Sequence, residues 1–281
     1  MTDRSLHAGS VLDLTGVPET MLWPLWHRVG IARKGESLLA DPMANELVDQ
    51  IDYPFERHFG KPSVFHAIRG RHCDDLIRAY VGKMEDDAVV VGLGEGLETQ
   101  PWRFGNSTPR WFSVDLPEAI AVRQRLMPEH PKLQLVACSA LDPAWMDRVP
   151  TGTRPFITAS GLLMYFRDEE IRGLLATIAE RFPGAELFFD TIPPMFAART
   201  RRGFRVTPHY TAPEMPWGIS IDRVTPFLTS CGWTVQSCQT YAEPYPDRLR
   251  FYALLSKIGP IRRRFAPGLV HARTSDFGHV A

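Results

Sequence analysis

The chain has 281 residues, of which 44% are hydrophobic and 23% charged, and its 32 basic and 32 acidic side chains leave a formal net charge of zero. This fits one large domain, or one domain with a cap, and argues against a broad nucleic-acid or membrane surface. No apolar run approaches the ~18 residues of a membrane span, and the start lacks the apolar segment of a signal peptide. We expect a cytoplasmic protein with no nucleic-acid partner and no membrane association; the sequence pattern gives no oligomeric state.

Cysteines and histidines follow no metal-binding pattern. The four cysteines form no CxxC pair, and the histidines form neither HxxxH nor HExxH. Reduced cysteines are the default in a cytoplasmic protein. We therefore predict no metal and no disulfide.

The first part of the chain has helical periodicity. Asp41 is an expected N-cap with Pro42 at the first helical position, and the apolar residues after it fall on one face, as do those of 76–84. We expect residues 1–85 to form a helical N-terminal cap.

From Ala88 onward, short apolar strands alternate with helices. The expected strands are "AVVVGL", "RWFSVD", "LQLVACS", "PFITAS" and "ELFFDTI". Repeated strand–helix units predict a parallel sheet with a ligand site at the carboxyl ends of the strands.

The C-terminal part departs from this alternation. After a helix that ends near Gly232, "TVQSCQTY" and "RFYALLS" are expected to be two strands joined as a hairpin. The predicted fold class is therefore α/β, a class I methyltransferase (Rossmann-like) fold. It would have a seven-stranded, mostly parallel sheet with an antiparallel last strand, built from residues 86–281.

The stretch "VVVGLGEGLETQ" is the strongest candidate for a ligand loop, because glycines after a strand let backbone amides approach a ligand. It fits a dinucleotide or S-adenosylmethionine. Glu95 and Glu98 would repel pyrophosphate but not a sulfonium nucleoside with an ammonium group, which favours the methyl donor. Asp115, at the end of the second strand, fits the ribose hydroxyls of either ligand and could also serve as a helix N-cap.

An ordered series of motifs covers most of residues 16–192. It runs through "GVPETMLWPLWHR", "DPMA", "IRGRHCDDLIRAYV", "VVVGLGEGLETQPWR", "VDLPEAIAVRQRLMP", "CSALDPAWMD", "ASGLLMYF" and "FPGAELFFD". With these motifs the chain resembles the leucine carboxyl methyltransferase family, in particular its bacterial branch of small-molecule O-methyltransferases similar to the tetracenomycin polyketide enzyme.

The resemblance implies S-adenosylmethionine as methyl donor and a role for each matching residue. Arg69 would bind the methionine carboxylate, which suits the planar fork of a guanidinium group. Tyr165 would lie at the floor of the pocket that donor and acceptor share, as a candidate catalytic residue. The other donor-site residues that the resemblance implies are Gly92, Gly94, Gly96, Asp115 with the adjacent Leu116, Ala140, Leu141 and Ser160.

Three positions depart from the family pattern. Gly92 stands where the family has an acidic or amide residue, Glu98 where it has Asp, and Ser160 where it has the Glu that holds the donor's ammonium group. We expect backbone carbonyls or Glu95 to take over that contact.

The acceptor side is expected in the segment "FRVTPHYTAPEMPWGIS", within a lid insertion near 195–221. Three prolines prevent a long helix there, and a long loop after a strand is usually functional. We predict His209 as a general base and Tyr210, Met215 and Trp217 as the acceptor wall.

The predicted function is O-methylation of a hydroxyl or carboxyl group on a small, aromatic or polyketide-like metabolite of secondary metabolism. The alternatives are methylation of a protein C-terminus, non-catalytic nucleotide binding, and a dinucleotide-dependent oxidoreductase.

Overall fold

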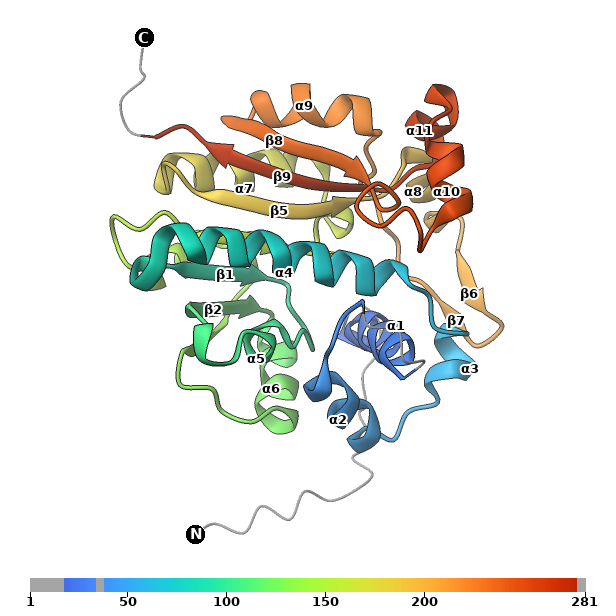
Figure 1. The fold of residues 1–281 in the computed structure, drawn as a ribbon, viewed down its shortest axis with the longest axis horizontal. Helices are drawn as coiled ribbons and strands as arrows, with labels where there is room; N and C mark the ends of the chain where they lie inside the picture. The colour runs from blue at the N-terminus through green and yellow to red at the C-terminus, as the bar shows by residue number, and fades with distance from the viewer. Residues whose placement is uncertain (1–17, 34–37, 277–281) are drawn as a thin grey trace.

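The computed structural model describes residues 18–33 and 38–276. A seven-stranded sheet in the order β3-β2-β1-β4-β5-β9-β8 forms the centre of the molecule (Figure 1). Its strands are β1 (Val89–Leu93), β2 (Arg110–Asp115), β3 (Leu133–Ala137), β4 (Phe156–Ala159), β5 (Glu186–Thr191), β8 (Trp233–Thr240) and β9 (Gly268–Thr274).

The first five strands run parallel, and β9 lies antiparallel to both of its neighbours, β5 and β8. β1 and β4 are buried along their whole length, which explains why these sequences are apolar without alternation. The predicted mostly parallel sheet with an antiparallel last strand is confirmed.

One predicted strand is wrong. "RFYALLS" forms the helix α10 (Arg250–Ser256), and the strand that pairs with β8 is "GLVHART", which is β9. A short apolar run fits a helix as well as a strand. Gly268, Leu269 and Val270 are buried, whereas α10 has no buried residue.

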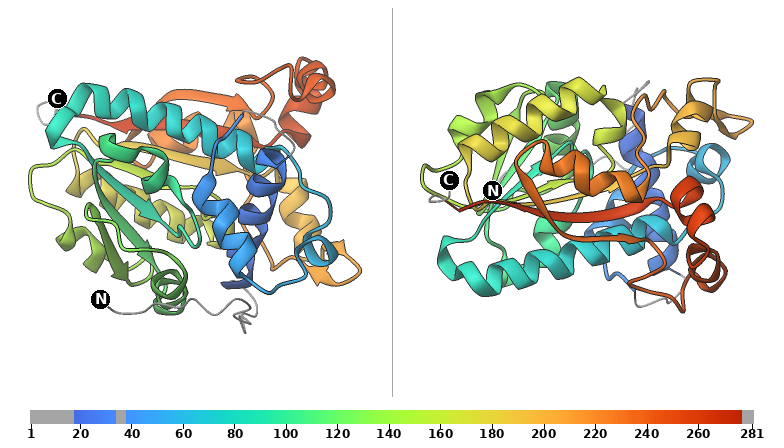
Figure 2. Two further views of the ribbon diagram at one scale, coloured as in Figure 1. Left: turned by 60° about the horizontal axis from the view of Figure 1, so that its bottom comes forward. Right: turned by 90° about the horizontal axis from the view of Figure 1, so that it is seen from above.

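Helices cover both faces of the sheet, as the view from above shows (Figure 2, right). α4 (Phe65–Met84) packs on one face, while α7 (Asp168–Arg181) and α9 (Ile221–Thr229) pack on the other. The remaining helices after β1 are α5 (Gln100–Arg103), α6 (Pro117–Leu126), α8 (Pro194–Thr200), α10 and α11 (Gly259–Phe265).

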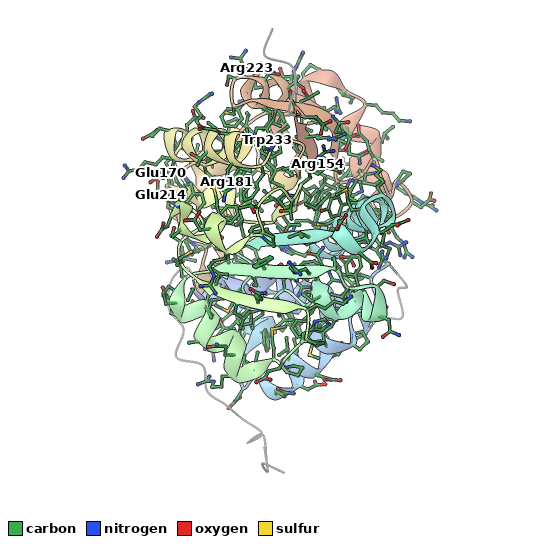
Figure 3. All side chains as sticks on the ribbon, turned by 90° about the vertical axis from the view of Figure 1, so that its left-hand side faces the viewer. Arg154, Glu170, Arg181, Glu214, Arg223 and Trp233 are labelled. Atoms are coloured by element: carbon green, nitrogen blue, oxygen red, sulfur yellow. The ribbon has the colours of Figure 1, made fainter. Side chains whose placement is uncertain are left out.

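Side chains fill the layer between α7 and the sheet. Trp233 of β8 lies in this layer, where its Nε1 donates to the Leu175 carbonyl at 2.9 Å, while Arg223 of α9 lies at the surface (Figure 3).

Before α4, the chain forms α1 (Leu22–Ala32), α2 (Pro42–Gln50) and α3 (Phe55–Phe59). Asp41 caps α2 by accepting the Ala44 amide at 3.2 Å, as predicted. These helices share a core with Tyr210 of the small hairpin formed by β6 (Arg205–Thr207) and β7 (Tyr210–Thr211). The division into a cap of 1–85 and a domain of 86–281 stays a prediction; residues 1–17 and 34–37 lie outside the described residues.

Within the described part of the chain, no helix is both long and apolar enough to cross a bilayer.

Candidate active site

A cavity of about 600 Å³ opens at the carboxyl ends of β1, β2, β4 and β5. This size suits a small ligand, and the strand order reverses there, between β1 and β4, where parallel α/β sheets bind ligands. One part is lined by the glycine loop after β1 and by the ends of β2 and β4. The other is lined by α1, the start of α4, α8 and the α10–α11 region.

The glycine loop has a backbone that side chains would disturb. Gly94 and Gly96 have φ angles of +61° and +50°, in the left-handed region that favours glycine. A Cβ on Gly94 would come within 2.6 Å of Leu162, and one on Gly96 within 2.7 Å of Met21. Both glycines line the cavity, so their backbone is open to a ligand.

Gly92 does not line the cavity. It lies inside β1, and a Cβ there would come within 1.8 Å of the Glu95 carboxylate. Glu95 is held there by Trp111, whose Nε1 donates to Oε1 at 2.9 Å, and by Arg123 at 3.5 Å. A carboxylate therefore occupies the space beside position 92, although it comes from position 95.

Asp115 lines the cavity at the end of β2. Its Oδ2 accepts the Gly96 amide at 2.7 Å and its Oδ1 accepts the Leu116 amide at 2.8 Å. Burial raises the pKa of Asp115, and the two amides partly offset this effect. The carboxylate thus fixes the loop and still has lone pairs free for a ligand.

Arg69 reaches the cavity from α4. Its Nη1 forms a 3.0 Å ion pair with Asp190 Oδ2, at the end of β5. Asp190 also accepts the Gly161 amide at 2.5 Å and the Tyr241 hydroxyl at 2.9 Å. Burial alone would lower the pKa of Arg69, but Asp190 raises it, so the guanidinium stays charged.

A buried ion network supports the glycine loop from behind. Arg28 of α1 contacts Glu98 at 3.1 Å and Asp41 at 3.2 Å, and its Nη2 donates to the Leu97 carbonyl. Arg103 contacts Glu98 and Asp74 at 2.7 Å each and Asp41 at 3.0 Å. Burial would raise the pKa of Glu98, but the two arginines lower it to about 2. The network joins the first helices to the loop.

Carboxylates outnumber cations in the cavity wall. The charged lining side chains, histidines aside, are Arg28, Arg69, Glu95, Glu98, Asp115 and Asp190. Four acids against two bases suit a ligand with a sulfonium and an ammonium group and disfavour one with two phosphates.

Of the remaining predicted donor-site residues, Leu116, Ala140 and Ser160 line the cavity, whereas Leu141 packs against the main core. Tyr165 also lines it, from a short 3-10 helix, Leu163–Tyr165, and burial raises the pKa of its phenol to about 12. The contacts of these residues with a ligand stay predictions.

On the acceptor side, only Met215 of the predicted residues lines the cavity. His209 is exposed in the β6–β7 turn, with its Nδ1 3.5 Å from Arg57. Tyr210 packs against Phe59, with ring centroids 4.8 Å apart.

Trp217 is also buried away from the cavity, because its Nε1 donates to Asp168 at 3.2 Å and its ring packs on Phe227. The short strands β6 and β7 thus place Tyr210 in the core of the N-terminal helices, whereas Trp217 belongs to the core between the sheet, α7 and α9.

Several lining residues could not be predicted from the sequence. His27 and Trp23 of α1 and His66 of α4 form one wall, and the mouth is bordered by Tyr252 of α10 and Phe265 of α11, which are half exposed. His66 and Arg69 are three residues apart, a spacing that puts two side chains on one face of a helix, but no local signal joins α1 to α4. α10, which contains Tyr252, was predicted as a strand.

A sequence profile of the leucine carboxyl methyltransferase family matches residues 26–179. The tetracenomycin polyketide synthesis O-methyltransferase TcmP of Streptomyces glaucescens is 31% identical over 189 residues, 66% of this chain and 70% of that protein. The chain belongs to the leucine carboxyl methyltransferase family. Members transfer a methyl group from S-adenosylmethionine, so the protein is an S-adenosylmethionine-dependent methyltransferase.

Two further proteins are similar to the present chain. A protein named S-adenosyl-L-methionine-dependent methyltransferase dpfgK, from Gibberella zeae, is 26% identical over 197 residues, 62% of this chain and 66% of the relative. The crystal structure of a DUF574 family protein from Streptomyces avermitilis has a TM-score of 0.54 at 14% identity and covers 88% of this chain and 96% of that one. The strand order of the present protein and its likeness to this neighbour confirm the predicted class I fold.

Proposed function

We propose that the protein methylates a hydroxyl oxygen on a small, flat, largely apolar metabolite of the polyketide type, using S-adenosylmethionine. The main support is that the wall of the cavity beyond Arg69 is aromatic and apolar. Its members include Trp23, Phe65, Met164, Phe196, Met215, Tyr252 and Phe265. The name of the relative TcmP points to the same chemistry.

The donor part has a matching set of groups. Gly94 and Gly96 would leave room for the nucleoside, and Asp115 would accept its ribose hydroxyls. Arg69, oriented by Asp190, would bind the carboxylate. We assign the ammonium group to the Glu95 and Glu98 side of the cavity, since Ser160 has no charge.

When bound, S-adenosylmethionine supplies a methyl group on a good leaving group. The protein then has to position the acceptor oxygen and exclude water. We propose that Phe196 and Met215, from the segment 195–221, cover the acceptor on one side, and that the α10–α11 region covers it on another.

The apolar wall of the cavity supports a small molecule over a protein C-terminus as the acceptor. A protein acceptor needs an open groove, and the lining here is mostly hydrophobic side chains. The four cysteines are free, which agrees with the proposed cytoplasmic location.

Methyl transfer from tritiated S-adenosylmethionine tests this proposal. Three acceptor sets are compared: hydroxylated naphthalenes and anthraquinones, the matching carboxylic acids, and a peptide ending in leucine. We expect label in the hydroxyl compounds as ethers that resist mild alkali. Label that appears only as alkali-labile esters, in the acids or the peptide, would contradict the proposal.

A further inference from the structure

Two histidines face each other in the acceptor part of the cavity. His27 of α1 and His66 of α4 both line it, and their ring centroids lie 5.0 Å apart in a T-shaped arrangement. His66 lies one turn before Arg69 on α4, so it is on the same face as the group assigned to the donor carboxylate. The pair therefore borders the place where donor and acceptor would meet.

The tautomer of His27 follows from its neighbour Trp23. The indole Nε1–H can only donate, and it points to His27 Nε2 at 3.1 Å. The Phe59 carbonyl is farther from the same nitrogen, at 3.4 Å, and an Nε2 that accepts from Trp23 cannot also donate to it. The proton of the neutral ring is therefore on Nδ1.

That Nδ1–H has no hydrogen-bond partner among the described residues, although His27 is only 6% exposed. Burial lowers the pKa of His27 to about 4, so the ring is neutral near pH 7. An unpaired buried donor is unfavourable and marks a place where a ligand oxygen would be bound.

His66 complements this donor. No hydrogen bond to its ring is present within the described ranges. Burial lowers the pKa of His66 well below its usual value, and the nearby Arg69, His27 and Arg28 lower it further, so it too is neutral and keeps a lone pair. One wall of the cavity thus offers one N–H donor and one free nitrogen lone pair.

We propose that His27 and His66 form the recognition site for an ionisable aromatic hydroxyl, with His66 as its proton acceptor. This inference rests on the proposed function. His27 Nδ1–H donates to the hydroxyl oxygen and orients it. As the oxygen becomes a nucleophile, its O–H bond breaks. The oxygen keeps the electron pair, and the proton forms an N–H bond with the lone pair of a His66 ring nitrogen.

Equilibrium binding of two matched probes tests the pair without turnover. The protein saturated with S-adenosylhomocysteine is titrated calorimetrically with 2-naphthol and with 2-methoxynaphthalene, which has the same rings but no proton to give. We expect the wild type to prefer 2-naphthol. His66→Leu removes the acceptor and should weaken 2-naphthol binding by about tenfold while leaving 2-methoxynaphthalene within about twofold. His27→Phe removes the donor and should weaken both probes by about tenfold, because the ether oxygen of 2-methoxynaphthalene can also accept from His27 Nδ1–H.

His130 lies outside the cavity, so His130→Leu is the matched control and should change neither affinity. Unchanged affinity for S-adenosylhomocysteine shows that each variant is folded, and His66→Met replaces His66→Leu if that variant is unstable. A wild type without preference for the hydroxyl, a preference that survives in His66→Leu, or unchanged 2-naphthol affinity in His27→Phe overturns the inference. Either result leaves the proposed function to be judged by the methyl-transfer assay.

Discussion

Asp115 combines a structural role with a predicted role in ligand binding. Its carboxylate accepts hydrogen bonds from the backbone amides of Gly96 and Leu116, and its remaining lone pairs are open to the cavity. A substitution therefore acts on the loop and on the ligand together, and the two effects have to be separated by experiment.

Asp115→Ala should weaken S-adenosylhomocysteine binding by about 1–3 kcal/mol, because the ribose hydroxyls lose a charged acceptor. Isothermal titration calorimetry measures this. Asp142→Ala is a suitable control, since Asp142 caps a short 3-10 helix by accepting the Ala144 amide and does not line the cavity. If affinity stays unchanged while the melting temperature falls, Asp115 has only the structural role.

His27 should make stability depend on pH. Its pKa is lowered from 6.5 to about 4 by burial, so the unfolded chain takes up a proton at a higher pH than the native protein does. The stabilisation is complete above about pH 6.5 and is lost as the pH falls toward 4.

When the pH is lowered from 7 to 5, protonation of His27 should lower the free energy of unfolding by about 2 kcal/mol. Urea denaturation at both pH values measures the loss, and His27→Gln should reduce it by about that amount. An equal loss in wild type and variant would show that His27 is already protonated in the native protein.

The position of most donor-side residues at the cavity could be predicted because it follows from local signals. Glycines after a buried strand and an acid at the end of the next strand lie together in any parallel sheet of this kind. Residue pairs that come together only through tertiary packing could not be predicted. His27 and His66 are 39 positions apart on different helices, and Glu95 occupies the space beside Gly92 only because Trp111 and Arg123 hold it.

At the scale of elements, Arg103 of α5 connects three segments. It contacts Asp41 at the start of α2, Asp74 of α4 and Glu98 of the loop after β1. All of these groups are buried or nearly so, and the loss of one charge leaves its partners unpaired in a medium of low polarity.

Arg103→Leu should lower the unfolding free energy by about 3–5 kcal/mol in urea denaturation. Arg33→Leu breaks the exposed Arg33–Asp49 pair and should cost no more than about 1 kcal/mol. Similar losses in the two variants would mean that the buried network adds no more than a surface ion pair.

Element boundaries were predicted well where burial is uniform. β2 has the predicted bounds, and β1, β4 and β5 differ by one or two residues. α10 was mistaken for a strand because its five apolar and aromatic residues, between Arg250 and Ser256, carry no clear period. The error hid the position of Tyr252 at the mouth of the cavity.

At the scale of the whole molecule, groups from distant parts of the chain meet at the carboxyl ends of the parallel strands. The donor loop follows β1, Arg69 comes from α4 before the sheet, and Tyr241 follows β8 near the end. The helices before β1 pack directly on the sheet through α4, so the site forms only when the N-terminal helices and the sheet fold together.

The central claim is that this cavity binds the sulfonium nucleoside and not a dinucleotide, and binding to the wild-type protein tests it most directly. S-adenosylhomocysteine at about a hundredfold excess over its Kd should stabilise the protein by about 2.7 kcal/mol and raise the melting temperature by roughly 5 °C. NADPH should give neither binding heat nor a shift, because four carboxylates line the cavity. Binding of NADPH without binding of S-adenosylhomocysteine would contradict the account.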